Sequence, residues 1–454
     1  MKYFIKNALI INENKKQKGS VLIEDEYIKR VITDPNEIQN IPGQVDNVIQ
    51  ADNKVLIPGI IDDHVHFRDP GLTHKGDIYT ESKAAVAGGV TSFMDMPNTN
   101  PPTCTMEEIH HKNAIASLKS FANYAFYLGL TDNNIHVIEQ INPETIAGIK
   151  IFMGASTGNL VVSDRTNLET IFAHAPVLIA THCEDDTTIQ SNLQNFTKKY
   201  DSHIPIEKHP DIRSPEACYK STKKAIELAE KHSSNLHLLH LSTQQEIELL
   251  RSLSNNKISG EACIHHLWFT DEDYTKYGPR IRWNPAIKQK KDQEALRKAL
   301  LDNVIEIIGT DHAPHTAEEK QIYIYPENYN YTTAPSGSPS IQHGLLTMLE
   351  LHYQNILPIE TIVQKMSHNP AYRFNISKRG YIREGYYADL ALIDLHTAPW
   401  QVNQDNLLYK CKWSPFDGVQ FHSKITHTFV NGNLIFENGT FNETIRGKQL
   451  KFNR

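Results

Sequence analysis

Short apolar runs alternate with longer amphipathic segments between about residues 55 and 311. This alternation is typical of repeated strand–helix units, in which a crossover helix follows each strand of a parallel sheet. Eight runs can be counted, starting near Val55, Val90, Phe121, Ala147, Ala175, Asn235, Lys257 and Val304. Eight parallel strands predict an α/β fold, a closed (β/α)8 barrel of the TIM type. An open doubly wound sheet is the alternative, which is disfavoured because no glycine-rich dinucleotide loop follows the first run.

The two ends of the chain share a second pattern, that of short alternating strands. It occurs in residues 3–11, 20–24, 27–32, 388–394, 425–430 and 433–436. Asn431-Gly432, between the last two segments, is a hairpin signal. We expect residues 1–54 and 385–454 to form one small β-sandwich domain beside a catalytic barrel of residues 55–384. Two independent β appendages are the alternative.

Polar side chains stand at the downstream ends of several barrel runs. The first run leads into the pentad His64-Val65-His66-Phe67-Arg68, whose first, third and fifth side chains would share one face of an extended strand. His182, His240 and Asp311 close later runs. Because parallel strands end at one mouth of a barrel, we expect the histidines and Asp311 to lie together as metal ligands. The guanidinium of Arg68 beside them would bind an anion. A His-x-His pair alone also occurs on exposed strands.

Composition excludes several other classes of protein. A net charge of −7 and a pI near 6.4 give no basic surface for nucleic acid. No apolar stretch reaches the roughly 20 residues of a membrane helix, and the first residues do not have the pattern of a secretory signal, so we expect a cytoplasmic protein. The five cysteines lack C-x-x-C spacing, which argues against a disulfide framework or a structural zinc site. Most of the 23 histidines, such as His110, His111, His203 and His209, are expected on the surface or in helices.

Seven short motifs carry a resemblance to a known family. They are His64-Val65-His66-Phe67-Arg68-Asp69-Pro70-Gly71, Met96-Pro97-Asn98-Thr99, Lys150-Ile151-Phe152, Thr181-His182-Cys183-Glu184, His240-Leu241-Ser242-Thr243, Asn284-Pro285 and Thr310-Asp311-His312-Ala313-Pro314-His315. In this order they resemble the dihydroorotases of the amidohydrolase superfamily across nearly the whole chain. The resemblance implies zinc-dependent, reversible cyclisation of N-carbamoyl-L-aspartate to L-dihydroorotate and water, a step of de novo pyrimidine (UMP) biosynthesis.

The resemblance also implies two zinc ions per subunit. His64, His66 and Asp311 would hold one ion, and His182 and His240 the second. Lys150, carboxylated by carbon dioxide, would bridge the two ions together with a hydroxide. An ammonium group beside two cations would be repelled, whereas an uncharged lysine that reacts with carbon dioxide becomes an anionic carbamate with two oxygens. Many bacterial dihydroorotases are expected to have an aspartate at the bridge, and residues 150–158 contain none. Hydantoinases share the lysine form, so the metal site does not name the substrate.

The substrate is indicated by other side chains. Arg68 can bind the ring carboxylate of dihydroorotate through two parallel hydrogen bonds, and Asn98 can add an amide donor. A salt bridge from Arg68 to Asp69 or Asp77 is the structural alternative. His315 would be a third carboxylate contact. Contacts to the ring amides are assigned to Asn284, Pro335 and Gly337.

For the mechanism, we expect Asp311 to act first as base and then as acid. A hydantoinase or allantoinase, or a scaffold without catalysis, are the alternatives, although no predicted metal ligand is missing. The loop 321–331 is either a lid or an ordinary exposed loop. A homodimer is expected from the base rate for oligomers.

Overall fold

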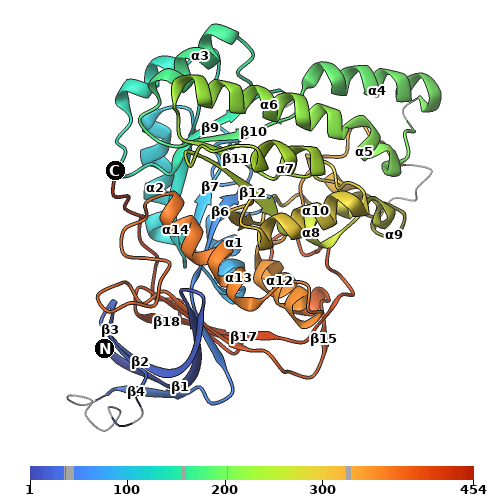
Figure 1. The fold of residues 1–454 in the computed structure, drawn as a ribbon. Helices are drawn as coiled ribbons and strands as arrows, with labels where there is room; N and C mark the ends of the chain where they lie inside the picture. Colours follow the sequence, from blue (N-terminus) through green and yellow to red (C-terminus); the bar gives the residue numbers. More distant parts are fainter. Residues whose placement is uncertain (35, 37–44, 155–159, 202, 324–328) are drawn as a thin grey trace.

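The structure is a computed structural model of residues 1–454, and it describes all of them except 35, 37–44, 155–159, 202 and 324–328. Its centre is an eight-stranded, wholly parallel sheet in the order β13-β12-β11-β10-β9-β8-β7-β6 (Figure 1). The strands are β6 (Ile60–Val65), β7 (Val90–Asp95), β8 (Asn123–Gly129), β9 (Gly148–Phe152), β10 (Ile179–His182), β11 (Leu236–Leu238), β12 (Ile258–Cys263) and β13 (Ile307–Gly309). The predicted TIM barrel is thereby confirmed.

The barrel closes between its first and last strands, just beyond the end of β13. Val65 and His312 form a parallel bridge, and the backbone N–H of His66 donates to the carbonyl of His312 at 2.7 Å. This closure brings the chain after β6 against the chain after β13. It therefore places residues some 245 positions apart at one mouth of the barrel.

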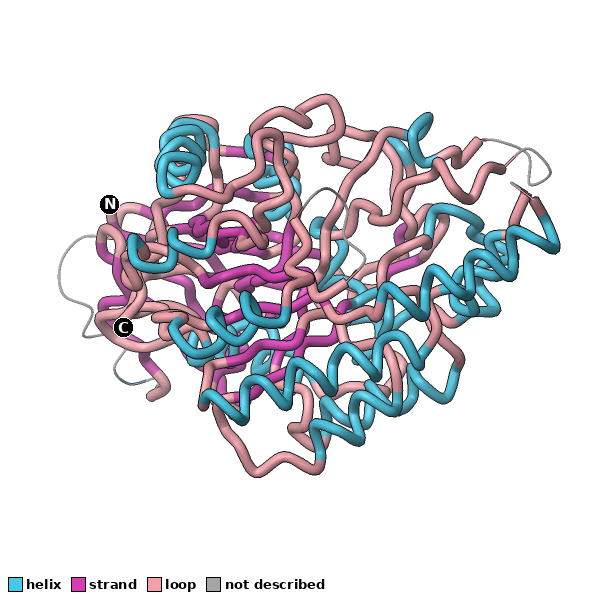
Figure 2. The backbone as a smooth tube through the Cα atoms, turned by 90° about the horizontal axis from the view of Figure 1, so that it is seen from above, coloured by secondary structure: helices cyan, strands magenta, loops and turns pink. Residues whose placement is uncertain are grey.

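Helices lie around the outside of the strands (Figure 2). The longer ones are α1 (Ile78–Ala87), α2 (Met106–Lys119), α3 (Arg165–His174), α4 (Asp186–Tyr200), α6 (Pro215–His232), α7 (Gln244–Arg251), α10 (Lys290–Leu301) and α12 (Gly344–Tyr353). The shorter ones are α5 (His209–Ile212), α8 (Ile264–Trp268), α9 (Tyr274–Tyr277), α11 (Ala317–Lys320), α13 (Ile359–Val363) and α14 (Asn369–Arg373). In the described ranges, no helix combines the length and apolar character needed to cross a bilayer.

Both chain ends contribute to one nine-stranded sheet below the barrel (Figure 1). Its strands are β1 (Lys2–Asn12), β2 (Lys15–Glu24), β3 (Tyr27–Ile32), β4 (Asn47–Gln50), β5 (Val55–Pro58), β14 (Leu390–Asp394), β17 (Lys424–Val430), β18 (Asn433–Glu437) and β19 (Thr440–Phe441). A small separate ribbon pairs β15 (Trp400–Gln401) with β16 (Gln420–Phe421). Because β5 pairs with β1 on one side and β14 on the other, two independent appendages are excluded.

The apolar run that begins at Val55 divides between the two sheets, and this corrects the predicted start of the first barrel strand. β5 belongs to the terminal sheet, whereas the barrel strand β6 starts at Ile60. Gly59 separates them in a crowded position, where a Cβ atom would lie 2.1 Å from the hydroxyl oxygen of Thr91. One continuous hydrophobic run therefore serves two sheets that meet at a glycine.

A buried polar cluster ties the terminal sheet to the barrel at this junction. The Arg379 guanidinium is paired with the Asp389 carboxylate, and each side chain is only 3% exposed. Arg379 also donates to Asn431 Oδ1 at 2.8 Å, and Asn123 Nδ2 donates to Asp389 Oδ2 at 3.2 Å. Gly59 adds a backbone hydrogen bond to the Asp389 carbonyl at 2.8 Å. The cluster joins β8, the terminal sheet and the link between them.

We expect Arg379→Met to destabilise the protein by about 3 kcal/mol or more, because Asp389 would be left as a buried carboxylate without its cation. The measurement is the urea midpoint of unfolding. Arg251→Met is the matched control, since Arg251 pairs with Asp302 at 2.9 Å on the exposed surface. Equal midpoints for the two variants would contradict a structural role for the buried pair.

Candidate active site

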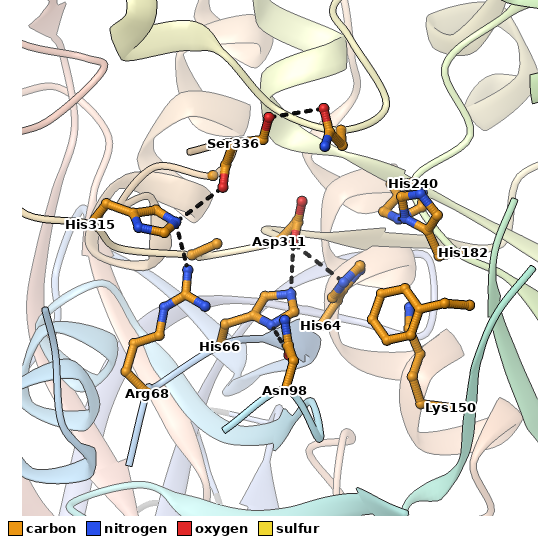
Figure 3. Close-up of a pocket in the computed structure, with 14 residues that line it drawn as sticks. His64, His66, Arg68, Asn98, Lys150, His182, His240, Asp311, His315 and Ser336 are labelled. Carbon is orange, nitrogen blue, oxygen red and sulfur yellow. Dashed lines mark hydrogen bonds and ion pairs between the residues drawn. The ribbon is translucent and has the colours of Figure 1, made fainter. Parts of the chain in front are cut away.

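A pocket opens at the carboxyl ends of the barrel strands, and it collects nearly all of the candidate residues (Figure 3). Its cavity volume is about 50 Å³, because the lining side chains lie close together. Its walls are formed by His64, His66, Arg68, Asn98, Lys150, Phe152, His182, His240, Asn284, Asp311, Ala313, His315, Ser336 and Gly337. Of the residues assigned from sequence, only Pro335 lies outside this wall; its carbonyl instead accepts from Lys320 Nζ at 3.0 Å.

Asp311 lies between the two histidines of the His-x-His pair. Its Oδ1 is 3.3 Å from His64 Nε2 and 3.0 Å from His66 Nε2. These three ligand atoms lie within 4.8 Å of one another, which suits a shared metal ion. Burial alone would raise the pKa of Asp311, but the neighbouring imidazoles of His64 and His66 hold it well below its usual range. Asp311 is therefore a carboxylate at neutral pH.

His182 and His240 form a second pair beside His64, with the ring centroids of His64 and His240 5.3 Å apart (Figure 3). His182 Nδ1 and His240 Nε2 lie 2.9 Å apart. His182 Nε2 is 3.0 Å from the buried carboxylate of Glu184, which Arg213 also contacts. Since Glu184 accepts the proton of His182 Nε2, the Nδ1 atom presents a lone pair toward His240. Burial lowers the pKa of His182, and it lowers that of His240 still further, so the uncharged ligand forms are favoured.

Lys150 projects from β9 into the pocket and is 1% exposed. Within the described part of the chain, its Nζ has no hydrogen-bond or ion-pair partner, and it lies 4.7 Å from the centroid of the Phe152 ring. Burial lowers the pKa of Lys150 to about 8. About a tenth of the Lys150 side chains are therefore uncharged at pH 7, far more than for an ordinary lysine, and only an uncharged amine can react with carbon dioxide.

The donor set fits divalent metal ions. Imidazole nitrogens and carboxylate oxygens are common ligands of zinc in proteins. Burial would lower the pKa of His64, yet Glu261 and Asp311 raise it overall, so this end of the pocket attracts positive charge. Either a proton or a metal ion can supply that charge.

Arg68 lies on the opposite side of the pocket from His182 and His240 (Figure 3). It is 6% exposed, and its Nε donates to the Pro314 carbonyl at 3.0 Å. The predicted alternative of a salt bridge is wrong, because Asp69 pairs with Lys119 at 3.0 Å and Asp77 with Lys410 at 2.7 Å. Among the described residues, no carboxylate forms an ion pair with Arg68.

Arg68 does not reach the pocket as part of an extended strand, as the sequence predicted. β6 ends at Val65, so the alternation of an extended strand does not continue through the pentad. Instead, Arg68 adopts a left-handed backbone conformation with φ of 68°, as do His240 (41°) and Asp311 (45°). Such φ values are uncommon outside glycine and cluster at functional sites. Three side chains thus reach the pocket from bends that directly follow strands.

Asn98 is oriented by a metal-ligand candidate. Its Oδ1 is 2.6 Å from His66 Nδ1, so this imidazole nitrogen donates and the His66 Nε2 lone pair faces Asp311. Because the amide oxygen is occupied, the Asn98 amide nitrogen remains as a donor at the pocket. Across the pocket, Ser336 Oγ donates to Asn284 Oδ1 at 2.9 Å, which likewise leaves the Asn284 amide nitrogen as a donor.

Sequence reasoning missed several residues that support the site. Glu261 accepts from His64 Nδ1 at 3.0 Å, and Glu184 and Ser336 have the roles given above. Glu184 belongs to the motif Thr181–Glu184, and Ser336 lies between Pro335 and Gly337, so their places in the sequence could have indicated both residues. Glu261 lies on β12, outside all seven motifs, and nothing in the sequence indicated it.

Two further expectations concern histidine exposure and the candidate lid. His209 is in helix α5, one of the two locations predicted for it, and it is fully buried. Its Nδ1 lies 2.8 Å from the Tyr331 hydroxyl and its Nε2 2.6 Å from the Trp283 carbonyl oxygen. These contacts fix the chain next to Asn284. Residues 324–328 of the loop 321–331 lie outside the described residues, so its role as a lid stays a prediction.

The barrel and its pocket of imidazoles and carboxylate define an amidohydrolase type of scaffold. The sequence profile of the Amidohydrolase family matches residues 55–435, and the chain belongs to this family. Two relatives that align with most of this chain are dihydroorotases. The dihydroorotase of Methanosphaera stadtmanae is 32% identical over 427 residues, covering 92% of each chain. That of Pyrococcus furiosus is 30% identical over 434 residues, covering 95% of this chain and 92% of the relative. The chain is a hydrolase that acts on cyclic amides.

Solved structures with a similar fold bear other names. The L-hydantoinase (dihydropyrimidinase) of Arthrobacter aurescens has a TM-score of 0.92 at 23% identity and covers 99% of both chains. The dihydropyrimidinase of Brevibacillus agri NCHU1002 has a TM-score of 0.87 at 24% identity, covering 97% of this chain and 96% of the other. At this level of identity the likeness shows the fold.

Gly337 provides a test of the pocket wall. It has a φ of 111°, and an added Cβ atom would lie 2.7 Å from Ala313 Cβ and 2.8 Å from the Ala313 carbonyl oxygen. We expect Gly337→Ala to lower kcat/KM for cyclic-amide hydrolysis at least about tenfold, equivalent to roughly 1.4 kcal/mol. Gly385→Ala is the control, because Gly385 has a φ of 80° but nothing within 4 Å. A similar loss in both variants would assign the effect to backbone strain alone.

Proposed function

We propose that the protein is a dihydroorotase, which interconverts N-carbamoyl-L-aspartate and L-dihydroorotate with release or uptake of water. The observation that carries the proposal is Arg68, a buried guanidinium in the pocket wall with no ion-pair partner among the described residues. Burial lowers the pKa of Arg68 to about 10, so the side chain is still a cation at neutral pH. A buried cation without a counterion is costly unless a ligand supplies the opposite charge.

Dihydroorotate carries a carboxylate on its ring, and this group is the counterion that such a pocket needs. The guanidinium of Arg68 can donate two parallel hydrogen bonds to it, and the free amide nitrogen of Asn98 adds a third. His315 contributes from the same side of the pocket. Hydantoin, allantoin and dihydrouracil have no ring carboxylate and would leave Arg68 unpaired. The amide nitrogen of Asn284 and the backbone at Gly337 would contact the ring amides; Pro335 retains only its sequence-based assignment.

Two zinc ions are part of the proposal. His64, His66 and Asp311 would hold one, His182 and His240 the other, and a carboxylated Lys150 would join them. Bound zinc supplies acidity to water, lowering its pKa from 15.7 toward about 7, and polarises the amide carbonyl. The buried, partner-free Nζ of Lys150 and its pKa of about 8 support carboxylation, because the reaction with carbon dioxide needs a free amine.

Asp311 moves the proton in both directions. As a carboxylate it accepts a proton from the attacking water, and it then donates this proton to the ring nitrogen that leaves, which opens the ring. In the reverse direction it takes a proton from the carbamoyl nitrogen as this nitrogen bonds to the carbon of the side-chain carboxyl group, and it returns the proton to the departing hydroxide, which leaves as water. Oδ1 of Asp311 lies between the two imidazoles, 3.3 Å from His64 Nε2 and 3.0 Å from His66 Nε2.

The cellular setting follows from the same proposal. Interconversion of these two metabolites belongs to de novo pyrimidine biosynthesis, in the cytoplasm. A homodimer is proposed from the base rate for soluble enzymes.

We expect purified protein loaded with zinc to hydrolyse dihydroorotate in clear preference to dihydrouracil and allantoin. Arg68→Met should raise KM for dihydroorotate by roughly 30- to 1,000-fold, since two charge-assisted hydrogen bonds contribute about 2–4 kcal/mol. Steady-state kinetics on the three substrates provide the measurement. Preference for dihydrouracil or allantoin, or an unchanged KM in Arg68→Met, would replace the proposal with a hydantoinase or allantoinase.

Asp311→Asn should remove nearly all turnover, by at least about 100-fold, because an amide of the same shape cannot accept and return the proton. The variant should keep its thermal unfolding midpoint. Asp77→Asn is the matched control: Asp77 caps α1 from outside the pocket, and asparagine caps equally well, so its activity should be unchanged. Retention of a tenth of the activity in Asp311→Asn would remove the proton-transfer role.

A further inference from the structure

Lys75 lies behind the wall of the pocket and has no part in the mechanism above. Its side chain is 14% exposed, and its Nζ lies 3.1 Å from His315 Nδ1 and 3.2 Å from Glu319 Oε2. The Glu319 carboxylate favours the ammonium form, although burial and then Arg68 lower the pKa of Lys75. An ammonium group has three donors and no acceptor. Whatever faces it at hydrogen-bond distance must accept.

This requirement fixes the tautomer of His315. Nδ1 accepts from Lys75, so the proton of the uncharged ring is on Nε2. Nε2 lies 3.1 Å from the carbonyl oxygen of Ser336, which is an acceptor and completes the arrangement. Burial, followed by the charge of Arg68, puts the pKa of His315 well below its ordinary value, so a doubly protonated ring does not compete.

The opposite tautomer satisfies the surroundings less well. With the proton on Nδ1, His315 could donate to Glu319 Oε2, which lies 3.4 Å away, and accept from Arg68. The Nδ1 proton would then face the Lys75 ammonium at 3.1 Å, and the Nε2 lone pair would face the Ser336 carbonyl at 3.1 Å. Two close contacts become repulsive, in exchange for one longer hydrogen bond and the contact with Arg68.

The favoured tautomer leaves one conflict, and it lies in the pocket. Arg68 Nη2 is 3.2 Å from His315 Nε2, and both atoms are donors (Figure 3). A carboxylate oxygen that accepts from both would remove this repulsion. The pair is therefore an anion receptor assembled before its ligand arrives.

We infer that Lys75 is a positioning residue: it fixes His315 as an Nε2–H donor and so completes the receptor for the substrate carboxylate. The inference rests on the proposed function and adds to it, because it explains how an uncharged histidine beside a guanidinium favours an anionic substrate over a neutral one. Lys75 does not touch the substrate, and its influence passes through His315.

The test is a double-mutant cycle of Lys75→Met with His315→Gln. Lys75→Met alone should raise KM for dihydroorotate about tenfold and leave kcat within about twofold, because only carboxylate binding depends on the tautomer. A glutamine amide donates without help from Lys75, so Lys75→Met should have little further effect on KM in the His315→Gln background. An equal rise in KM in both backgrounds, or a loss confined to kcat, would overturn the inference.

Three controls keep the outcome decisive. Lys83→Met, which removes another partly buried lysine paired with a glutamate, should leave KM unchanged. Lys75→Arg retains a cationic donor and should restore KM to within about threefold of wild type, even if the methionine variant is unstable. Arg68→Met separates the two proposals: an unchanged KM in Arg68→Met refutes the carboxylate receptor itself, whereas a raised KM with no effect of Lys75→Met refutes only the role of Lys75.

Discussion

The hydrogen bond from the His66 backbone to the His312 carbonyl closes the barrel, and the whole pocket depends on that closure. Asp311 follows the last strand and the His-x-His pair follows the first, so only a closed barrel can place them within hydrogen-bond distance. The same closure brings Arg68 against Pro314 and His315. Metal ligands and anion receptor are thus two consequences of one junction between β6 and β13.

The hydrogen-bond partners of the imidazoles determine which ring nitrogens are free to bind in the pocket. Glu261 occupies His64 Nδ1, Asn98 occupies His66 Nδ1, and Glu184 occupies His182 Nε2. Each partner fixes which nitrogen carries the proton and leaves the other lone pair toward the pocket, as outer partners of metal-bound histidines do. Lys75 acts in the opposite sense on His315, where it directs a proton rather than a lone pair inward. Under the proposed function, these partners therefore divide the pocket into one half that binds metal cations and another that binds the substrate carboxylate.

The strand pattern could be predicted from the sequence because buried parallel strands are apolar throughout and end in polar residues at one mouth. Asp311, His182 and His240 were found in this way. The left-handed bend at Arg68 was not, since a φ of 68° has no reliable signal in a non-glycine residue. Glu261, Lys75 and the burial of His209 depend on partners far away in the sequence, such as Tyr331, 122 positions from His209. Such pairings arise only when the elements pack.

The similarity of this fold to hydantoinases and its sequence similarity to dihydroorotases concern different parts of the molecule. The barrel strands, the terminal sheet and the cluster of metal-ligand candidates suit any cyclic amide, because hydrolysis of the ring amide needs the same polarised carbonyl and proton transfer. Selection of an anionic ring needs something more, a cation that stays unpaired until the substrate binds. Arg68 meets this condition because the carboxylates that act on it have other partners. Asp95 pairs with Lys112, Glu319 pairs with Lys75, and Asp311 lies between His64 and His66. The partners of these carboxylates are therefore as necessary to the proposed specificity as Arg68 itself.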